Sequence, residues 1–328
     1  MCKCVPIAIG SADVQMGLGC RILVARPTAL EIQIVNFKFI KTRQQFLDNR
    51  NIAILINPRS GKGHSLRSGE WLAAKLASLR VSFELLSTPW PVTLERFTEI
   101  WIVGGDGTFN YFINHYPHNQ LPLGLFKGGT GNDFAWSIYG DCTLEQNFEK
   151  VWSGSPQRID AGLCNDRLFV NSSGIGFDGE VLKSIKQIRW LGGHLGYLFV
   201  VIRKIFSYKE EQVRVSIDGE QKSAKYLLMI INNSSRTGGG FLVTPKASLT
   251  DGRLDLMLCD PLPFLKRLKY LPVIEKGKHL SLPFINYKQI QNVEIESNQV
   301  LNAQLDGELI SAAKFSYKIS SGKLLIKY

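Results

Sequence analysis

The stretch WIVGGDGTFNYFI, residues 101–113, decides the fold. Its apolar beginning predicts a buried strand, which stops at two glycines. Asp106, Gly107 and Thr108 follow, and the chain then turns amphipathic, as a helix would. An ordinary tight turn would fit, because Gly and Asp tolerate positive φ. A loop that lets phosphate approach the backbone would fit as well, so the rest of the chain has to decide.

Strands alternate with helices around this stretch. We expect strands in NIAILIN (51–57), VSFELLST (81–88), EIWIVGG (99–105) and LPLGLFKGG (121–129). We expect helices over residues 66–79, 108–116 and 131–138. This alternation predicts an α/β domain in which a parallel sheet lies between two helical layers.

The pattern changes after about residue 160. Short strands separated by turn residues are expected at RLFVNSSGIGF (167–177), QVRVSIDGE (212–220), KYLLMIINNS (225–234), RLDLMLCD (253–260), NVEIES (292–297) and LNAQLDGELI (301–310). Only one helical stretch is expected among them, roughly Val181 to Phe206. This second part therefore predicts a β-sandwich.

The expected domain boundaries follow from this change. Residues 49–160 form the α/β domain, residues 161–309 form the β-sandwich, and the last strand, within 310–328, fits either domain. Residues 1–48 show no interpretable pattern and are treated as an N-terminal extension.

Three glycine-rich loops follow predicted strands and precede predicted helices: NPRSGKG (57–63), GGDGT (104–108) and GGTGND (128–133). Ligands of parallel α/β sheets bind outside the carboxyl ends of the strands, and glycine lets the backbone approach a polyphosphate. A Walker loop is excluded, because Ile56 stands where Gly is needed and Gly63 follows Lys62. In this setting Asp106 would supply charge for phosphoryl transfer, although a helix N-cap role is compatible with it.

Bulk properties limit the partners. The formal net charge is +11, which favours anionic partners such as a nucleotide or an anionic membrane face. No nucleic-acid-binding motif or long basic block is present. The six cysteines form no CxxC pair, and no apolar run is long enough for a transmembrane helix. We therefore expect a cytoplasmic protein that touches a membrane peripherally.

Six motifs recur in the order and spacing of a known family: NPRSGKG, GGDGTFN, GLFKGGTGNDFA, NSSGIGFDGEV, GGGFLVTPKASLTDGRLDL and LDGE. From about residue 50 to the end, the chain resembles the diacylglycerol kinase catalytic-domain family of lipid kinases. The resemblance implies a first domain like that of NAD kinases and phosphofructokinases, with the active site in a cleft beside the β-sandwich. It also implies Mg²⁺-dependent transfer of the ATP γ-phosphoryl to a lipid hydroxyl.

The resemblance also assigns residues by their motif positions. The nucleotide would contact Asn57, Ser60, Gly61, Thr88, Gly104, Gly105, Asp106, Gly107, Thr108, Thr130, Gly131, Asn132 and Asp133. Glu308 and Asp106 would be the catalytic carboxylates. A structural Mg²⁺ would be held by Asp251 with main-chain carbonyls of Ser248 and Arg253.

Simpler interpretations stay open for these positions. DGE at 306–308 fits a hairpin turn, as does a second DGE at 218–220, and Asp251-Gly252 fits a turn. Two residues depart from the family pattern, Lys127 in place of Pro and Trp136 in place of Arg. Lys127 could contact phosphate or be solvated.

The basic, apolar stretch 181–206 fits helices that cover a lipid slot or lie on an anionic membrane, or helices that pack on the sandwich. Lys183, Lys186 and Arg189 would then meet anionic vesicles. The sequence does not identify the lipid, which could be diacylglycerol, a sphingoid base or another long-chain alcohol. Alternative functions are an NAD kinase-like enzyme and a catalytically inactive nucleotide- or lipid-binding sensor. Bacterial relatives suggest a homodimer.

Overall fold

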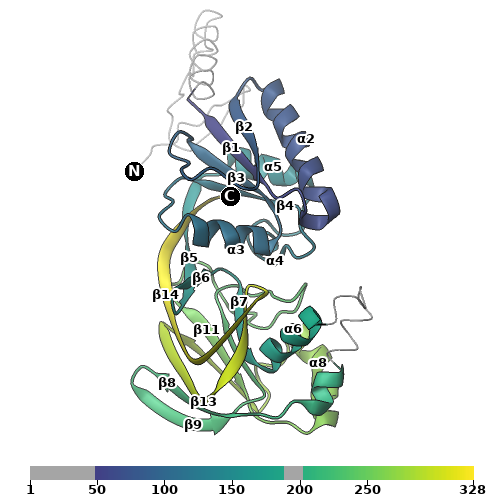
Figure 1. Ribbon diagram of the computed structural model, residues 1–328, viewed down its shortest axis with the longest axis vertical. Coiled ribbons are helices and arrows are strands. Elements are labelled where there is room, and N and C mark those ends of the chain that lie inside the picture. The colour runs from purple at the N-terminus through teal and green to yellow at the C-terminus, as the bar shows by residue number, and fades with distance from the viewer. Residues whose placement is uncertain (1–48, 188–201) are drawn as a thin grey trace, which may run out of the picture. The chain divides into compact units, whose positions relative to one another are not determined.

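The first half of the chain forms a parallel sheet in strand order β2-β1-β3-β4. A computed structural model describes residues 49–187 and 202–328 (Figure 1). The four strands are β1 (Asn51–Ile56), β2 (Ser82–Ser87), β3 (Glu99–Gly104) and β4 (Leu123–Lys127). The inner strands β1, β3 and β4 are buried along most of their length, as near-continuous apolar runs predict.

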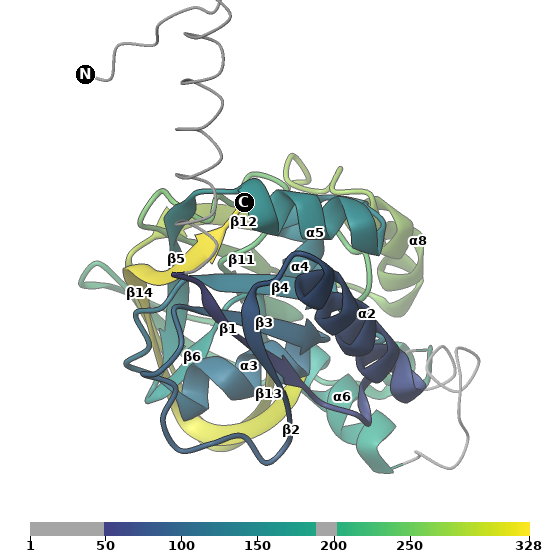
Figure 2. The same cartoon turned by 90° about the horizontal axis from the view of Figure 1, so that it is seen from above.

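Helices cover both faces of this sheet (Figures 1 and 2). They are α2 (His64–Ser78), α3 (Asp106–His115), α4 (Asp133–Tyr139) and α5 (Leu144–Ser153), with the 3-10 turn η1 (Ser60–Gly63) before α2. Trp71 of α2 meets Phe148 of α5 at 5.9 Å between ring centroids, so these helices share one face. Phe109 of α3 stacks on Phe134 of α4 at 5.0 Å on the other face. The predicted α/β class is confirmed.

The second half is built of mostly antiparallel strands. They are β5 (Pro156–Cys164), β6 (Arg167–Phe169), β7 (Ser172–Gly176), β8 (Gln212–Ile217), β9 (Glu220–Lys225), β10 (Leu228–Asn232), β11 (Leu254–Cys259), β12 (Ile285–Ile290), β13 (Asn292–Leu305) and β14 (Glu308–Lys327). Buried and exposed residues alternate along the first half of β13, which buries one face. Phe169, Ile295 and Phe315 belong to the core enclosed by these strands. The predicted β-sandwich is likewise confirmed.

Strand β14 joins the two halves. It pairs antiparallel with β13 and β5, and near its end Ile326 pairs in parallel with Leu123 of β4. One strand therefore contributes hydrogen bonds to both parts, as the assignment of 310–328 to either domain allowed. The boundaries near residues 48, 160 and 309 stay predictions.

The expectation of a single helical stretch in the second half is wrong. Besides α6 (Phe177–Gln187) and a helical segment at residues 202–207, α8 (Phe264–Glu275) lies against the second half (Figure 1). The twelve residues of α8 are all exposed or half-buried, and Pro272 lies inside the helix, where a proline usually predicts a helix end. Residues 188–201 of the predicted stretch, including Arg189, lie outside the described residues. In the described ranges, every helix is too short or too polar to span a membrane.

Candidate active site

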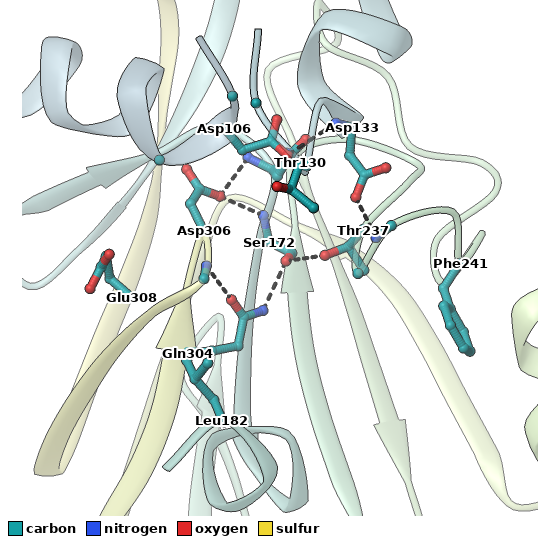
Figure 3. Close-up of a pocket in the computed structure, with 18 of the residues that line it drawn as sticks. Asp106, Thr130, Asp133, Ser172, Leu182, Thr237, Phe241, Gln304, Asp306 and Glu308 are labelled. Atoms are coloured by element: carbon teal, nitrogen blue, oxygen red, sulfur yellow. Dashed lines mark hydrogen bonds between the residues drawn. The ribbon is translucent and has the colours of Figure 1, made fainter. Parts of the chain in front are cut away.

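A cavity of about 1480 Å³ is lined by both halves of the chain (Figure 3). One end is formed by the three glycine-rich loops, with Asp106 and Thr130 (Figure 3). The other end is apolar and includes Leu182 of α6. A single cavity therefore offers one polar and one apolar compartment.

The three loops pack against each other through glycine backbones. A Cβ on Gly105 would lie 2.5 Å from the Gly131 oxygen, and one on Gly129 would lie 2.3 Å from the Gly105 Cα. A Cβ on Gly61 would lie 2.4 Å from the Gly128 oxygen. Real side chains do not fit at these distances, so the loops come together only because these residues are glycines.

The first loop is shaped by Asn57. Its side-chain Oδ1 accepts a hydrogen bond from the Arg59 N–H at 3.2 Å, and its carbonyl accepts one from the Ser60 N–H at 2.9 Å. Gly61 and Lys62 then adopt left-handed φ values of 56° and 55°. The loop thus folds back toward the cavity before α2 begins.

Asp106 connects the second loop to α4. Its Oδ2 accepts a hydrogen bond from the Asp133 N–H at 3.0 Å, and its Oδ1 accepts one from the Phe134 N–H at 3.0 Å. These donors belong to the first turn of α4, so the carboxylate caps that helix rather than its own helix α3. Burial raises the pKa of Asp106 to about 6. Asp106 is therefore not the N-cap of the helix that follows it, because Gly105 holds that position; its carboxylate instead satisfies N–H groups of α4 and also lines the cavity.

The side chain of Asn132 holds the third loop in shape. Its Oδ1 accepts hydrogen bonds from the N–H groups of Gly128 and Gly129 at 3.3 and 3.1 Å, and its Nδ2 donates to the Gly129 oxygen at 2.9 Å. Asn132 holds the loop but does not line the cavity.

Asp133 links the α/β half to a glycine-rich segment of the second half. Its Oδ1 lies 2.9 Å from Nε of Arg236, and its Oδ2 accepts a hydrogen bond from the Gly239 N–H at 2.7 Å. The Arg236 guanidinium lies 4.4 Å from the ring centroid of Trp136. These contacts hold residues 236–239 against the cavity, which Thr237, Gly238 and Gly239 line.

Asp306 is a site residue that the sequence reasoning missed. Its carboxylate accepts backbone hydrogen bonds from Val170, Asn171 and Ser172 at 2.8, 2.9 and 3.0 Å, and a side-chain bond from Asn110 at 3.0 Å. Burial raises its pKa against these bonds, which lower it. The only signal in the sequence was its place beside Glu308 in LDGE.

Glu308 is the exposed first residue of β14 and lines the cavity. In the view of Figure 3, Asp306 lies between Glu308 and Asp106. The turn before Glu308 is fixed by Gln304, whose Oε1 accepts from the Gly307 N–H at 2.9 Å and whose Nε2 donates to the Ser172 hydroxyl at 2.9 Å. These hydrogen bonds therefore fix the backbone of the hairpin that leads to Glu308.

The apolar compartment lies between the sandwich and helices α6 and α8. Its lining comprises Phe177, Val181, Leu182, Leu228, Ile230, Phe241, Val243, Met257, Leu271 and Ile274. The carboxyl groups of Asp178 on α6 and Glu275 on α8 also line the cavity, and burial raises the pKa of Asp178 to about 6. A long hydrocarbon chain would find an apolar environment here.

Twelve of the seventeen predicted site residues line the cavity: Asn57, Ser60, Gly61, Thr88, Gly105, Asp106, Gly107, Thr108, Thr130, Gly131, Asp133 and Glu308. Gly104 and Asn132 lie in the loops but do not line it. The remaining three, Asp251, Ser248 and Arg253, share a turn before β11 and also do not line the cavity.

In that turn, Asp251 accepts hydrogen bonds from the Arg253 N–H at 3.0 Å and from Gln289 Nε2 at 3.1 Å. Gly252 has a φ of 69°, so the Asp-Gly turn is what the backbone shows. Within residues 49–187 and 202–328, no three His, Cys, Asp or Glu residues gather as a metal cluster would.

The two departures from the family pattern have defined partners. Lys127 donates from Nζ to the Gly140 oxygen, just beyond α4, at 2.9 Å. It therefore satisfies a carbonyl at the end of that helix and does not line the large cavity. Trp136 is the aromatic face that receives Arg236.

The family models match both halves of the chain. Residues 51–164 match the diacylglycerol kinase catalytic domain, and residues 171–327 match the YegS C-terminal NAD kinase beta sandwich-like domain. These two domains identify the chain as a lipid kinase. The chain belongs to the diacylglycerol kinase family.

Relatives extend over most of the chain. It is 26% identical to the diacylglycerol kinase of Mycobacterium tuberculosis over 274 residues, which is 78% of this chain and 88% of that protein. It is 26% identical to the diacylglycerol kinase of Bacillus subtilis over 219 residues, covering 66% and 72%. A crystal structure of a diacylglycerol kinase from Bacillus anthracis is similar in fold, with a TM-score of 0.63, 19% identity, and 85% and 97% coverage.

Proposed function

We propose that the protein transfers the γ-phosphoryl group of ATP to the hydroxyl of a long-chain lipid, either diacylglycerol or a sphingoid or other long-chain alcohol. One observation carries this proposal: a single cavity joins glycine-loop backbones to an apolar compartment, with Glu308 in its lining. Polyphosphates bind to glycine-rich loops and helix N-termini, whereas hydrocarbon chains bind to apolar walls.

In this proposal the loops hold the triphosphate through backbone N–H groups. Asp106 holds the second loop to the first turn of α4, and Asn132 holds the third loop in shape through Gly128 and Gly129. The lipid hydroxyl oxygen attacks the γ-phosphorus and its proton passes to the carboxylate of Glu308. The bond from the γ-phosphorus to the bridging oxygen breaks, and ADP leaves.

Mg²⁺ fits the polar end of the cavity. The cation prefers one or two carboxylates together with phosphate oxygens, and the half-buried Asp106 carboxylate is a suitable oxygen donor. When bound, the ion would neutralise charge on the phosphates. We also propose a second Mg²⁺, held by Asp251 with the carbonyls of Ser248 and Arg253. This ion would stabilise the turn and takes no part in the phosphoryl transfer.

The alternative functions are less well supported. An NAD kinase-like enzyme acts on a soluble substrate, which would leave the large apolar compartment without a purpose. An inactive sensor would not need Glu308 and Asp106 in the lining of one cavity. Peripheral contact with an anionic membrane follows from the origin of the lipid, and a homodimer rests on the resemblance alone.

The test is phosphoryl transfer from γ-labelled ATP with Mg²⁺ to diacylglycerol, a sphingoid base, ceramide and a polyprenol in detergent micelles. Label in a chloroform-soluble product is expected with at least one acceptor, and NAD serves as the soluble acceptor control. Labelled NADP without a labelled lipid would contradict the proposal. ATP binding without any transfer would favour the sensor.

A further inference from the structure

Exposed apolar side chains gather at one place on the surface. The described residues include ten large apolar side chains with high exposure, and five of them lie in two segments: Ile202, Phe206, Phe264, Leu265 and Leu268. Phe206 and Leu265 are 58% and 66% exposed. The rings of Phe206 and Phe264 lie 5.1 Å apart, so residues 202–206 and the start of α8 form one surface, here called the α8 patch.

Arg267 fastens the two segments together. Its Nη1 donates to the carbonyls of Ile205 and Tyr208 at 3.1 and 3.2 Å, and its Nη2 donates to the Glu210 carboxylate at 2.7 Å. Its Nε donates to the Leu262 carbonyl at 2.7 Å. Because this guanidinium is mostly buried, the α8 patch is a fixed surface rather than two independent segments.

The surroundings of the patch are basic. Residues 202–211 and 262–278 contain eight Lys or Arg and three Glu. Two of the cations are already neutralised, Lys204 by Glu180 and Arg267 by Glu210. Arg203, Lys266 and Lys269 are exposed beside the apolar side chains. Apolar side chains with flanking cations suit a surface of hydrocarbon and anionic headgroups.

The same helix also lines the apolar compartment. Phe264, Leu265 and Leu268 of α8 are exposed, whereas Leu271 and Ile274 on the following turns line the cavity. The α8 patch is therefore continuous, along one helix, with the wall that would receive the lipid chain. A membrane on this patch would place the bilayer beside the apolar end of the cavity.

We propose that the α8 patch docks on an anionic lipid bilayer, with Leu265, Phe264 and Phe206 inserted and Lys266 and Lys269 facing the headgroups. This inference rests on the proposed function for the identity of the substrate, but the surface itself can be tested separately. An isolated apolar patch of this kind on a soluble surface marks an interaction site. The flanking charges select an anionic bilayer among the possible occupants.

Two double variants of the full chain test the proposal. Phe264→Ser with Leu265→Ser removes apolar area, and Lys266→Glu with Lys269→Glu reverses charge. Co-sedimentation is measured with phosphatidylcholine vesicles that contain or lack phosphatidylglycerol. We expect the wild type to bind only the anionic vesicles, and each double variant to bind them at least about tenfold more weakly.

Two control variants lie on strands of the β-sandwich, outside the α8 patch. Val300→Ser removes another exposed apolar side chain, and Lys222→Glu reverses an exposed charge on β9; both should bind vesicles as the wild type does. Unchanged binding in the two double variants, or a wild type that ignores anionic vesicles, would overturn the proposal. So would a dimer in sedimentation velocity that Leu265→Ser dissociates, because the patch would then be a protein interface.

Activity in detergent micelles separates this inference from the proposed function. The double variants should phosphorylate micellar lipid at the wild-type rate, because the cavity lining is unchanged. Loss of vesicle binding with micellar activity retained supports the α8 patch. Absence of micellar activity in the wild type would instead count against the proposed function and leave the vesicle result to stand by itself.

Discussion

Asn110 donates a hydrogen bond from Nδ2 to Oδ2 of Asp306 at 3.0 Å, across 196 positions of sequence. Asn110 ends the GGDGTFN motif on α3, and Asp306 belongs to LDGE at the β13–β14 turn. Both side chains are buried, at 7% and 8% exposure. The bond ties the loop that would hold phosphate to the turn that carries Glu308, so the two motifs meet at one point of the cavity.

Loss of the Asp306 carboxylate should destabilise the fold. Asp306→Asn replaces one of two accepting oxygens by an NH₂ group that faces N–H donors, leaving buried donors unpaired. We expect the free energy of unfolding to fall by about 2–4 kcal/mol, as measured by urea denaturation.

Asp218→Asn is the matched control for this change. Asp218 has nearly the same turn geometry, with a φ of 51° against 48° for Asp306, and it is exposed at the β8–β9 turn. Its substitution should change stability by less than about 0.5 kcal/mol. Equal effects at both positions would mean that the turn, and not the buried carboxylate, matters.

Two neighbouring glycines should respond differently to alanine. Gly105→Ala would push a methyl group against the backbone of the third loop, so we expect loss of stability and of ATP binding. A Cβ on Gly107 would meet no described atom within 4 Å and would point into open space. Gly107→Ala should therefore keep the melting temperature.

ATP titration calorimetry completes this comparison. If the triphosphate approaches the backbone at Gly107, alanine there should weaken ATP binding about tenfold while the fold stays intact. Wild-type ATP affinity in Gly107→Ala would place the phosphates elsewhere in the cavity.

Trp136 should be needed for the Arg236 contact. Trp136→Arg, which restores the residue usual in the family, would replace the aromatic face by a second guanidinium beside Arg236. We expect a loss of about 1 kcal/mol in stability and a higher KM for ATP. Trp136→Phe keeps an aromatic face and should lose less than half of this. An unchanged KM in Trp136→Arg would show that the segment 236–239 is held without the ring.

Acid should weaken nucleotide binding through Asp106. Its pKa of about 6 means that the carboxyl gains a proton as the pH falls through 6, where an ordinary aspartate stays ionised. A protonated oxygen accepts poorly from the N–H groups of α4, so the two loops would separate. We expect ATP affinity to decrease between pH 7 and pH 5.

Two substitutions assign this pH effect. Asp106→Asn should bind ATP more weakly at all pH values and without the decrease, whereas Asp178→Asn, which removes another carboxyl with a pKa of about 6, should retain it. The same decrease in Asp106→Asn would assign the effect to a different group.

Local sequence pattern predicted the first half of the fold well. Strands β3 and β4 are short apolar runs that lead into glycines, and helices α3 and α4 start where those glycine loops end, so the pattern and the structure coincide near Gly104 and Asp106. Helix α8 was missed because Pro272 inside it reads as a helix end, although Tyr270 and Ile274 pack against the core.

The candidate site was predictable in its members but not in its contacts. Glycine motifs identify the loops, yet nothing in the sequence pairs Asp133 with Arg236 or Asn110 with Asp306, because these pairs form only when the two halves meet. The role expected of Asp106 shows the same limit. The sequence shows that the loop carries a charged side chain. The bonds of this carboxylate to α4, however, form only because Gly61, Gly105, Gly128 and Gly129 let the loops pack closely.

Single-turnover transfer of the γ-phosphoryl to the lipid acceptor, compared between Glu308→Gln and Glu275→Gln, is the most direct measurement. Both glutamates are exposed and line the cavity, but Glu275 lies at the end of α8. Glu308→Gln should slow transfer by about 10²–10⁴-fold and keep ATP affinity, and Glu275→Gln should keep both. Transfer at the wild-type rate in Glu308→Gln would contradict its role as the proton acceptor.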